Sequence, residues 1–292
     1  KCREYLAQLR WPQGFQCFRC GGRKAWGVGV GRRECAACGY QASVRAGTIF
    51  HGSHQPLTTW FRAMWWVTNQ KTGASALGLH RLLGFGSYRT AWLMLHKLRR
   101  AMVRPERDRL TGRVEVDETY VGAPEKGRHG RRIGEKALVV VAAQEDGNGI
   151  GRIRMKRVPN GKAENLHSFI QDAVEVGAIV HTDAWQGYAG IEVKGYRHEV
   201  TELVHTDDDE NMLPRVHRVV SLLKRWLMGT HQGAVSHQHL DYYLDEFTFR
   251  FNRRTSQSRG KLFYRLVQQA VRIPPTSYTR VCQHVRVPRH NP

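Results

Sequence analysis

Two apolar segments that each lead into an aspartate place the strongest constraint on how this chain folds. Asp117 lies in the strand predicted over Arg113–Val121, and Asp183 directly follows the strand predicted over Ala178–Thr182. Either aspartate alone could simply end a strand at the surface, but that reading is weak for both together because each follows an apolar run. One carboxylate from each of two adjacent strands can hold divalent metal for phosphoryl transfer. The sequence therefore predicts that Asp117 and Asp183 bind catalytic Mg²⁺ or Mn²⁺.

The elements predicted around these aspartates follow the ribonuclease-H-like order. Three strands are followed by a helix, two further strands and two long helices, at Arg113–Val121, Ala137–Ala143, Ile150–Val158, Lys162–Val174, Ala178–Thr182, about Gly195–Glu199, Leu213–Met228 and Ser236–Arg253. We therefore expect an α/β catalytic domain over residues 109–255, with a mixed five-stranded sheet and helices packed on it.

The third metal ligand is less clearly marked in the sequence. His217 follows Asp183 by 34 positions, and a neutral imidazole suits Mn²⁺ or zinc better than Mg²⁺. His217 could instead position water or act as an acid or base, or be a solvated residue of a basic helix. The acidic run 207–210 offers a replacement carboxylate, although such a run is more often a solvated loop. Glu118 is a poorer candidate because neighbouring residues of a strand point to opposite faces.

Lys224 is expected to share a helix face with His217, because it follows seven residues later. A lysine there could reach a phosphate or a base near the scissile bond. General basicity of the helix is the alternative, since Arg215, Arg218 and Arg225 lie on the same segment.

Four of the six cysteines form two Cys-x-x-Cys pairs, Cys17 with Cys20 and Cys35 with Cys38, separated by fourteen residues. Two such knuckles match tetrahedral zinc, whereas a redox dithiol would need only one pair. Metal binding in a reducing cytoplasm fits better than a disulfide scaffold. Residues 1–48 are therefore predicted to be a zinc ribbon, held together by its structural Zn²⁺.

Residues 49–108 are predicted to be a helical region with a helix-turn-helix pattern. Helices are expected at Leu57–Asn69, Ala74–Leu83 and Tyr88–Met102, with a glycine-containing turn before the last. The basic residues of that last helix lie largely off its apolar stripe. A plain helical hairpin with a solvated basic face is the alternative.

The formal net charge of +21, from 46 Lys and Arg against 25 Asp and Glu, predicts a polyanionic partner, and nucleic acid is the usual one. The loop 122–136 is glycine-rich and basic, and we expect it to lie along a phosphate backbone rather than to be merely solvated. The candidate DNA-binding residues are Arg89, Lys97, Arg99, Arg100, Lys126, Arg128, Arg131, Arg132, Arg218, Lys224 and Arg225. Residues 256–292 are expected to form a basic C-terminal tail. The longest apolar run, Ala137–Ala143, is far too short to span a bilayer.

These segments resemble one family over nearly the whole chain: DDE-type transposases of bacterial insertion sequences that begin with a zinc ribbon, the group of insertion sequence fifteen-ninety-five. The segment at Asp117 resembles its Asp-Glu-Thr-Tyr-Val-Gly motif, and the segment from Thr182 to Tyr188 resembles its Thr-Asp-x-x-x-x-Tyr motif. Residues 5–12 resemble its ribbon entry, and residues 244–254 resemble its closing helix, which is the most specific stretch.

The resemblance implies a ribonuclease-H-like domain, Mg²⁺ dependence, and cutting and joining of DNA at the ends of a mobile element. It carries over Asp117 and Asp183 as metal ligands and Lys224 as the basic residue after the third ligand, where many DDE enzymes have Glu in place of His217. The expected partner is double-stranded DNA, bound by a homodimer or higher homo-oligomer in the cytoplasm at the nucleoid. Two alternatives stay open: a catalytically impaired, domesticated DNA-binding protein, and a nuclease of the same fold that cuts without joining.

Overall fold

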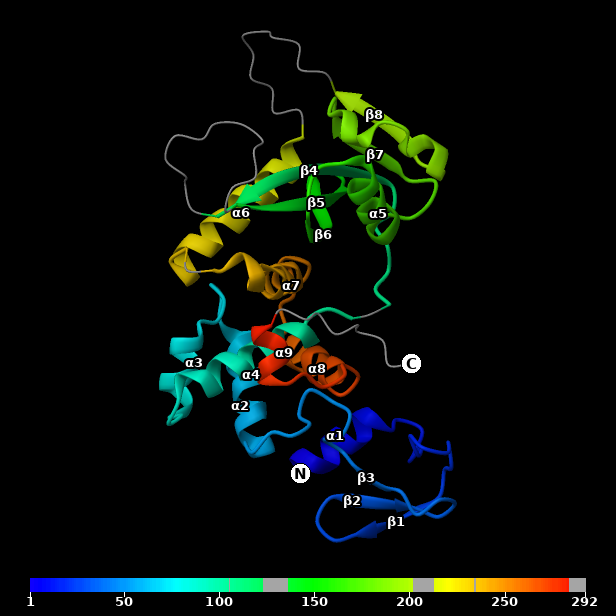
Figure 1. Ribbon diagram of the computed structural model, residues 1–292, viewed down its shortest axis with the longest axis vertical. Coiled ribbons are helices and arrows are strands. Elements are labelled where there is room, and N and C mark those ends of the chain that lie inside the picture. The colour runs from blue at the N-terminus through cyan, green and yellow to red at the C-terminus, as the bar shows by residue number, and fades with distance from the viewer. Residues whose placement is uncertain (105, 123–135, 202–212, 234, 284–292) are drawn as a thin grey trace. The chain divides into compact units, whose positions relative to one another are not determined.

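The computed structural model of the chain describes residues 1–104, 106–122, 136–201, 213–233 and 235–283 (Figure 1). The chain divides into two compact units: Lys1–Pro105 together with Ser256–Pro292, and Glu106–Thr255. The second unit contains both aspartates, Asp117 and Asp183.

The Glu106–Thr255 unit is built on a five-stranded sheet with the strand order β6-β5-β4-β7-β8. β4 (Arg113–Val121), β5 (Ala137–Asp146) and β6 (Gly149–Val158) form an antiparallel meander. β7 (Ile179–Asp183) and β8 (Arg197–Thr201) pair in parallel beyond β4 and are joined by two short turns of 3₁₀-helix, η1 (Gln186–Tyr188) and η2 (Ile191–Lys194). The order is the ribonuclease-H-like one, which confirms the predicted fold class.

Helices cover both faces of this sheet (Figure 1). α5 (Ala163–Ala173) packs on one face, and α6 (Pro214–His231) and α7 (Leu240–Phe251), preceded by η3 (His237–His239), pack on the other. β5 is buried on both sides because its alternating residues enter two cores: Leu138 and Val140 face α5, whereas Val139 and Val141 face α6 and α7. A strand that is buried on both faces appears in the sequence as an unbroken apolar run.

β4 has a different alternation, and this alternation positions the site. Val114 and Val116 lie in the core under α5, so Glu115 and Asp117 point to the face that carries α6. Two polar side chains of a central strand are thereby directed toward a single helix.

The end of α7 is attached to the edge strand β6 by one side-chain amide. Asn252 accepts a hydrogen bond from the N–H of Ile153 at 2.7 Å and donates one to its carbonyl at 3.1 Å. Arg254 stacks on the ring of Phe251 at 4.1 Å and donates to the carbonyl of Gly151 at 3.3 Å. The amide of Asn252 therefore satisfies backbone groups that an edge strand would otherwise leave unpaired.

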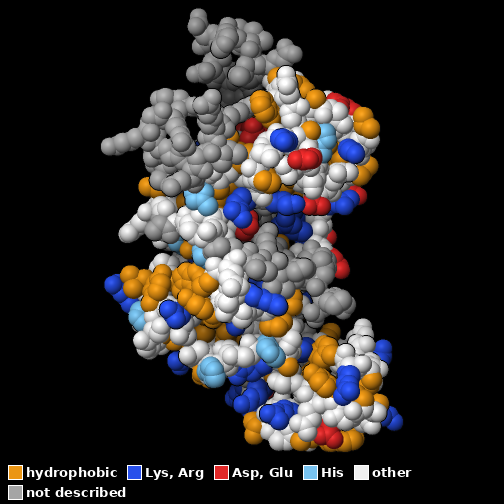
Figure 2. Space-filling view, in the orientation of Figure 1, with side chains coloured by type: hydrophobic (Ala, Val, Ile, Leu, Met, Phe, Trp, Pro, Cys, Tyr) orange, Lys and Arg blue, Asp and Glu red, His pale blue; other side chains and the backbone are white. Residues whose placement is uncertain are grey.

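The other unit begins with α1 (Cys2–Arg10) and a three-stranded antiparallel sheet of β1 (Ala25–Val28), β2 (Arg32–Cys35) and β3 (Gln41–Ser43). Lys and Arg side chains are prominent on the visible surface of this ribbon (Figure 2). The helices that follow are α2 (Leu57–Asn69), α3 (Ala76–Leu83) and α4 (Tyr88–Ala101). Gly84 ends α3 in the left-handed conformation with φ 63°, as the predicted glycine turn requires.

Residues 256–292 were expected to be a basic tail, and their described part is instead helical. α8 (Arg259–Ala270) and α9 (Tyr278–Cys282) belong to the first unit, and α8 packs on α1, α2 and α4. Leu262, Leu266, Val267 and Ala270 are buried on one face of α8. The pattern i, i+4, i+5, i+8 is helical, and the arginines among these residues obscure it.

α4 is also more deeply packed than its sequence suggested. Of its predicted DNA-binding residues Arg89 is exposed, whereas Lys97, Arg99 and Arg100 are buried. The expectation that these three lie off the buried side of the helix is wrong, because α3, α8 and α9 all contact α4. Arg99, for example, donates to the carbonyl of Ala74 at 3.2 Å.

Candidate active site and zinc site

The register of the central strands brings Asp117 and Asp183 together. β4 and β7 are parallel neighbours in which Glu115 lies opposite His181. Asp117 and Asp183 each lie two residues further along, so the same offset puts them side by side on one face of the sheet. Oδ1 of Asp117 accepts from the N–H of Glu118 at 2.7 Å. Oδ1 of Asp183 accepts from the N–H of Trp185 at 3.1 Å, and these bonds orient both carboxylates.

The charge of Asp117 is poorly accommodated without a cation. Its side chain is only 18% exposed. Burial raises the pKa of this carboxyl, and the negative charge of Asp183 raises it further, whereas the N–H of Glu118 and the imidazole of His217 act in the opposite direction. Two carboxylates held close together in a poorly solvated place are stabilised by a divalent cation. The electrostatics of Asp117 therefore fit a metal ligand.

His217 approaches the same carboxylate from α6. Its Nε2 lies 3.4 Å from Oδ2 of Asp117, and its side chain is 49% exposed. Lys224, which follows two helical turns later, is exposed on the same face of α6, and Arg218 and Arg225 are exposed beside that face. The helix thus presents an imidazole and a set of cations next to the aspartate pair.

Glu115 attaches the start of this helix to the strand of Asp117. Its carboxylate is 1% exposed and accepts from the backbone N–H groups of Arg215 and Val216, at 2.8 and 2.9 Å. These are N–H groups of the first turn of α6, which have no partner within the helix. Glu115 therefore acts as the cap of α6 from a neighbouring strand, two residues before Asp117. A negative charge at this end of a helix also complements the helix dipole.

A buried ion pair completes this attachment. Nη1 of Arg215 lies 3.0 Å from Oε1 of Glu115, and its Nη2 lies 2.7 Å from Oε1 of Glu145 at the end of β5. Arg215 also donates to the carbonyls of Gly147 and Gly149. One guanidinium thus joins α6, β4 and the β5–β6 turn.

On the opposite face of the sheet, a side-chain hydrogen bond joins the two segments that contain the aspartates. The hydroxyl of Tyr188 donates to Oε2 of Glu118 at 2.7 Å, so Glu118 faces away from the aspartate pair, as expected. Tyr188 is fully buried, and burial together with the charge of Glu118 raises its pKa well above the ordinary value. Gly187 allows this close packing, since a Cβ there would lie 2.5 Å from the carbonyl of Gly161.

Glu115, Arg215 and Tyr188 were not predicted as parts of the site. For Glu115 the sequence did hold a signal, because an acidic residue at an inward position of an otherwise apolar strand must find a partner. Its partner Arg215 lies 100 positions away, and no spacing rule connects two such residues.

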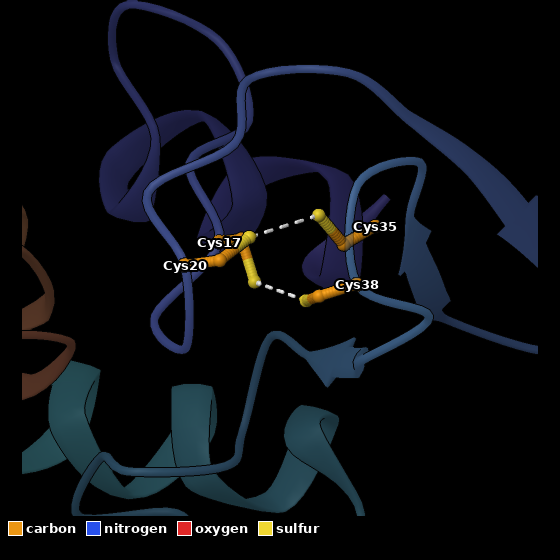
Figure 3. Close-up of side chains that lie close together, drawn as sticks. All are labelled: Cys17, Cys20, Cys35 and Cys38. Atoms are coloured by element: carbon orange, nitrogen blue, oxygen red, sulfur yellow. Dashed lines mark hydrogen bonds between the residues drawn. The ribbon is translucent and has the colours of Figure 1, made fainter.

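The four cysteines of the ribbon converge from two loops (Figure 3). Their sulfur atoms all lie within 4.8 Å of one another, with 3.7 Å from Cys17 to Cys38 and 3.6 Å from Cys20 to Cys35. A tetrahedron with Zn–S bonds of about 2.3 Å places its sulfurs about 3.8 Å apart. Over the described residues this is the one set of three or more metal-binding side chains that is so compact. The geometry of the four sulfurs therefore fits the predicted structural zinc site.

Glycines close both loops behind the sulfurs. Gly21 and Gly39 have φ of 74° and 67°, and their N–H groups donate to the carbonyls of Cys17 and Cys35. Burial of the Cys17 thiol opposes its ionisation, but bonds from two backbone N–H groups and from neighbouring thiols lower its pKa to about 7. The lowered pKa favours binding of metal by Cys17 as a thiolate.

Several predicted residues fall outside the described part of the chain. They are the acidic run 207–210 and the basic residues Lys126, Arg128, Arg131 and Arg132 of the loop 122–136. Their roles stay predictions. Within the described residues, no helix is long and apolar enough to cross a membrane.

Replacing Glu115 by Gln should loosen the attachment of α6. The variant keeps the shape of the side chain but loses the charge that pairs with Arg215, and we expect a loss of about 3 kcal/mol in the free energy of unfolding, measured with urea. Glu145→Gln is the matched control, because that carboxylate is 29% exposed and holds no N–H group of α6; its loss should be about 1 kcal/mol or less. Equal losses in the two variants would contradict the role given to Glu115.

Metal analysis of the purified chain should find about one zinc for the ribbon. Cys17→Ser should lose this zinc and lower the melting temperature of the ribbon, because metal binding supplies much of the folding energy of so small a unit. Cys2→Ser is the control, since Cys2 lies in α1 outside the cluster. A Cys17→Ser protein with wild-type zinc content would refute the site.

Comparisons with known proteins found family models that match two parts of the chain and relatives that match it more weakly. Residues 109–252 match the ISXO2-like transposase domain of the IS1595 group, and residues 1–41 match the transposase zinc-ribbon domain of the same group. A protein of Halobacterium salinarum, described as an uncharacterized protein in transposable element ISH50, is 27% identical over 274 residues, covering 84% of this chain and 88% of its own. An uncharacterized transposase-like protein of Haemophilus influenzae is 25% identical over 112 residues, covering 38% of this chain and 89% of its own.

Solved structures are similar only at a low level. The catalytic core of BIV integrase has 16% identity and a TM-score of 0.31, over 47% of this chain and 81% of that one. Mos1 transposase in its paired-end complex has 14% identity and a TM-score of 0.31, over 80% of each chain. At such scores these structures add nothing to the assignment, which rests on the two domain matches and the site they contain. The chain belongs to the IS1595 family of insertion-sequence transposases, DDE-type enzymes with a zinc ribbon.

Proposed function

We propose that this transposase cleaves and joins DNA at the ends of its insertion sequence, with Asp117 and Asp183 as ligands of catalytic Mg²⁺ or Mn²⁺. His217 acts as the third ligand, and Lys224 contacts a phosphate of the DNA end. The observation that carries the proposal is the meeting of two carboxylates from adjacent parallel strands with an imidazole 3.4 Å from one of them.

The reaction consists of two phosphoryl transfers. In the first, water attacks a phosphodiester at the element end, and the bond to the 3′ oxygen breaks to leave a free 3′-hydroxyl. In the second, this hydroxyl attacks a phosphodiester of the target, forming one bond as another breaks. Bound divalent cations would activate the attacking oxygen and stabilise the leaving one.

The residues of the chain have separate tasks in this reaction. Asp117 and Asp183 supply two carboxylates from adjacent parallel strands. The N–H groups of Glu118 and Trp185 fix the orientation of these carboxylates. His217 supplies a ring nitrogen from α6. Lys224 lies two turns along the same face, where an ammonium can hold the phosphate of a DNA end in line with the attack.

Double-stranded DNA is the partner that fits the charge of the chain, +21. Arg218 and Arg225, exposed beside Lys224, would extend the phosphate contacts along α6. Joining requires two element ends to meet a target, and a homodimer or higher homo-oligomer brings one site to each end. We place the protein in the cytoplasm at the nucleoid, where its DNA lies.

The aspartate pair is tested by cleavage and strand transfer on the ends of the encoding element, with Mg²⁺ or Mn²⁺. Asp117→Asn and Asp183→Asn should each abolish both products, whereas Asp172→Asn, an exposed carboxylate on α5, should retain them. Unchanged activity in both site variants would sink the proposal. Wild-type cleavage without joining would instead indicate a nuclease.

A thermal-shift experiment separates metal binding from catalysis. Mn²⁺ should raise the melting temperature of the wild type but of neither aspartate variant. Because burial raises the pKa of Asp117, ionisation of this group disfavours folding as pH rises above the ordinary aspartate range. Without metal at neutral pH, Asp117→Asn should therefore be at least as stable as the wild type, and a large loss of stability would argue against a strained carboxylate.

His217 is tested by changing the atom that would bind the metal from nitrogen to oxygen. If its nitrogen is a ligand, wild type should be more active with Mn²⁺ than with Mg²⁺, because nitrogen suits the softer ion. His217→Glu supplies oxygen and should keep or raise Mg²⁺ activity, whereas His217→Ala should lose most activity. Ser221→Ala, exposed on the same face of α6, is the control. Wild-type activity in His217→Ala with either metal would make His217 a bystander.

A further inference from the structure

A cavity of about 250 Å³ lies in the first unit, between α4 from Arg89 to Lys97, the loop 52–55 and the start of α9. Arg89 and Lys97 of α4 line it, two helical turns apart, together with Leu93 between them and Tyr278 of α9. Arg89 lies over the ring of Tyr278 at 4.9 Å from its centroid. The walls are therefore cationic and aromatic, and among the described residues no aspartate or glutamate lines them.

The loop that closes the cavity is firmly built. The guanidinium of Arg45 donates to the carbonyls of Phe50 at 3.4 Å and Gln55 at 3.2 Å, and also to that of Ser53. The indole N–H of Trp60 donates to the hydroxyl of Ser53 at 3.0 Å. The loop is held in shape by these bonds without help from a ligand.

Lys97 is the unexplained group in this cavity. Its side chain is 6% exposed, and in the described part of the chain the structure records no hydrogen bond or ion pair for its ammonium group. Burial lowers the pKa of Lys97, and the positive charges of Arg100 and Arg45 lower it further. A mostly buried cation with two other cations near it costs free energy unless an anion joins it. The missing component of the cavity is a negative charge.

We propose that this cavity binds a phosphate group of DNA, with Lys97 at its base and Arg89 at its mouth. The inference rests on the proposed function, which makes DNA the polyanion that the chain meets. The cavity exceeds the volume of several waters, at about 30 Å³ each, so it has room for part of the attached nucleotide. Leu93 and the ring of Tyr278 would take its sugar or base, since aromatic faces stack on bases of any sequence.

The first test measures how salt weakens binding of the full chain to a mixed-sequence DNA duplex. The slope of log affinity against log salt becomes shallower by about 0.9 for each phosphate that the protein no longer neutralises. Lys97→Met should lower the slope by about that amount, whereas Lys71→Met, an exposed lysine outside the cavity, should lower it less. Equal slopes in the two variants would overturn the proposal.

Stability of the DNA-free protein provides a check on folding. Lys97→Met removes an unpaired buried charge and keeps most of the side-chain volume, so its melting temperature should equal or exceed that of the wild type. A clear fall would show that Lys97 stabilises the fold and would contradict an unfilled anion site.

Filling the cavity tests its shape independently of charge. Leu93→Trp keeps every cation and should reduce DNA affinity at least fivefold if a nucleotide enters. Wild-type affinity in a folded Leu93→Trp protein would refute occupancy of the cavity. If that variant does not fold, thermal shifts of the wild type and Lys97→Met with a short duplex decide: stabilisation of both to the same degree would refute the site.

The source of the phosphate is separated by adding inorganic phosphate or a deoxynucleoside monophosphate to the wild type. Stabilisation by these small anions, without a difference in DNA slope between Lys97→Met and Lys71→Met, would assign the site to free phosphate and overturn the role in DNA binding. All these readouts are independent of cleavage, so failure of the aspartate variants to affect catalysis would leave them interpretable.

Discussion

The catalytic half of this protein depends on one buried carboxylate. Glu115 accepts two N–H groups from the first turn of α6 and pairs with Arg215, and thereby fixes the helix against the central strand. Asp117 lies two residues along that strand, and His217 lies two residues beyond Arg215 on that helix. The 3.4 Å approach of imidazole to carboxylate is therefore a consequence of the same anchor. A helix held only by its apolar face could slide or rotate by the fraction of an ångström that matters to a metal ligand.

The site combines this rigidity with an unfavourable charge. Asp117 is mostly buried beside Asp183, and burial raises its pKa, so the folded protein without metal holds a carboxylate that would be more stable in water. The unfavourable term arises on this face of the sheet, whereas the core on the opposite face, around Phe169 and Ile170, is apolar apart from the hydrogen-bonded pair of Tyr188 and Glu118. Metal binding would relieve it, which links cation affinity to the stability of the fold. Lys97 shows the same pattern with the sign reversed, as a mostly buried cation with which no described carboxylate forms an ion pair. In each unit, therefore, a described residue carries a charge whose partner would come from outside the chain.

Some residues of the family motifs lie on the face of the sheet that carries the aspartate pair, and others stabilise the fold. Glu118 and Tyr188 lie next to or near an aspartate in sequence, yet they meet on the far face of the sheet. In the closing helix, Asn252 and Arg254 bind the backbone of β6. Such residues can be as specific to a family as catalytic ones, because a hydrogen bond to a buried or edge backbone group tolerates few replacements.

The sequence by itself determined the order and type of the elements in the catalytic unit. It also predicted which four cysteines form the zinc site and which two aspartates lie together on the sheet. These are local properties: apolar runs predict strands, helical spacing predicts α5, α6 and α7, and two Cys-x-x-Cys pairs predict a zinc site. Only the tertiary structure decided that Glu115 caps α6, that α8 packs against α4, and that Lys97 lines a cavity instead of a solvated face. Each of these three features depends on residues far apart in the chain, such as Glu115 and Arg215. In addition, the local pattern of basic residues in α4 and α8 is the same whether another helix or water covers those residues. Burial is a property of the whole fold, so a single segment cannot show which of its charges will be enclosed.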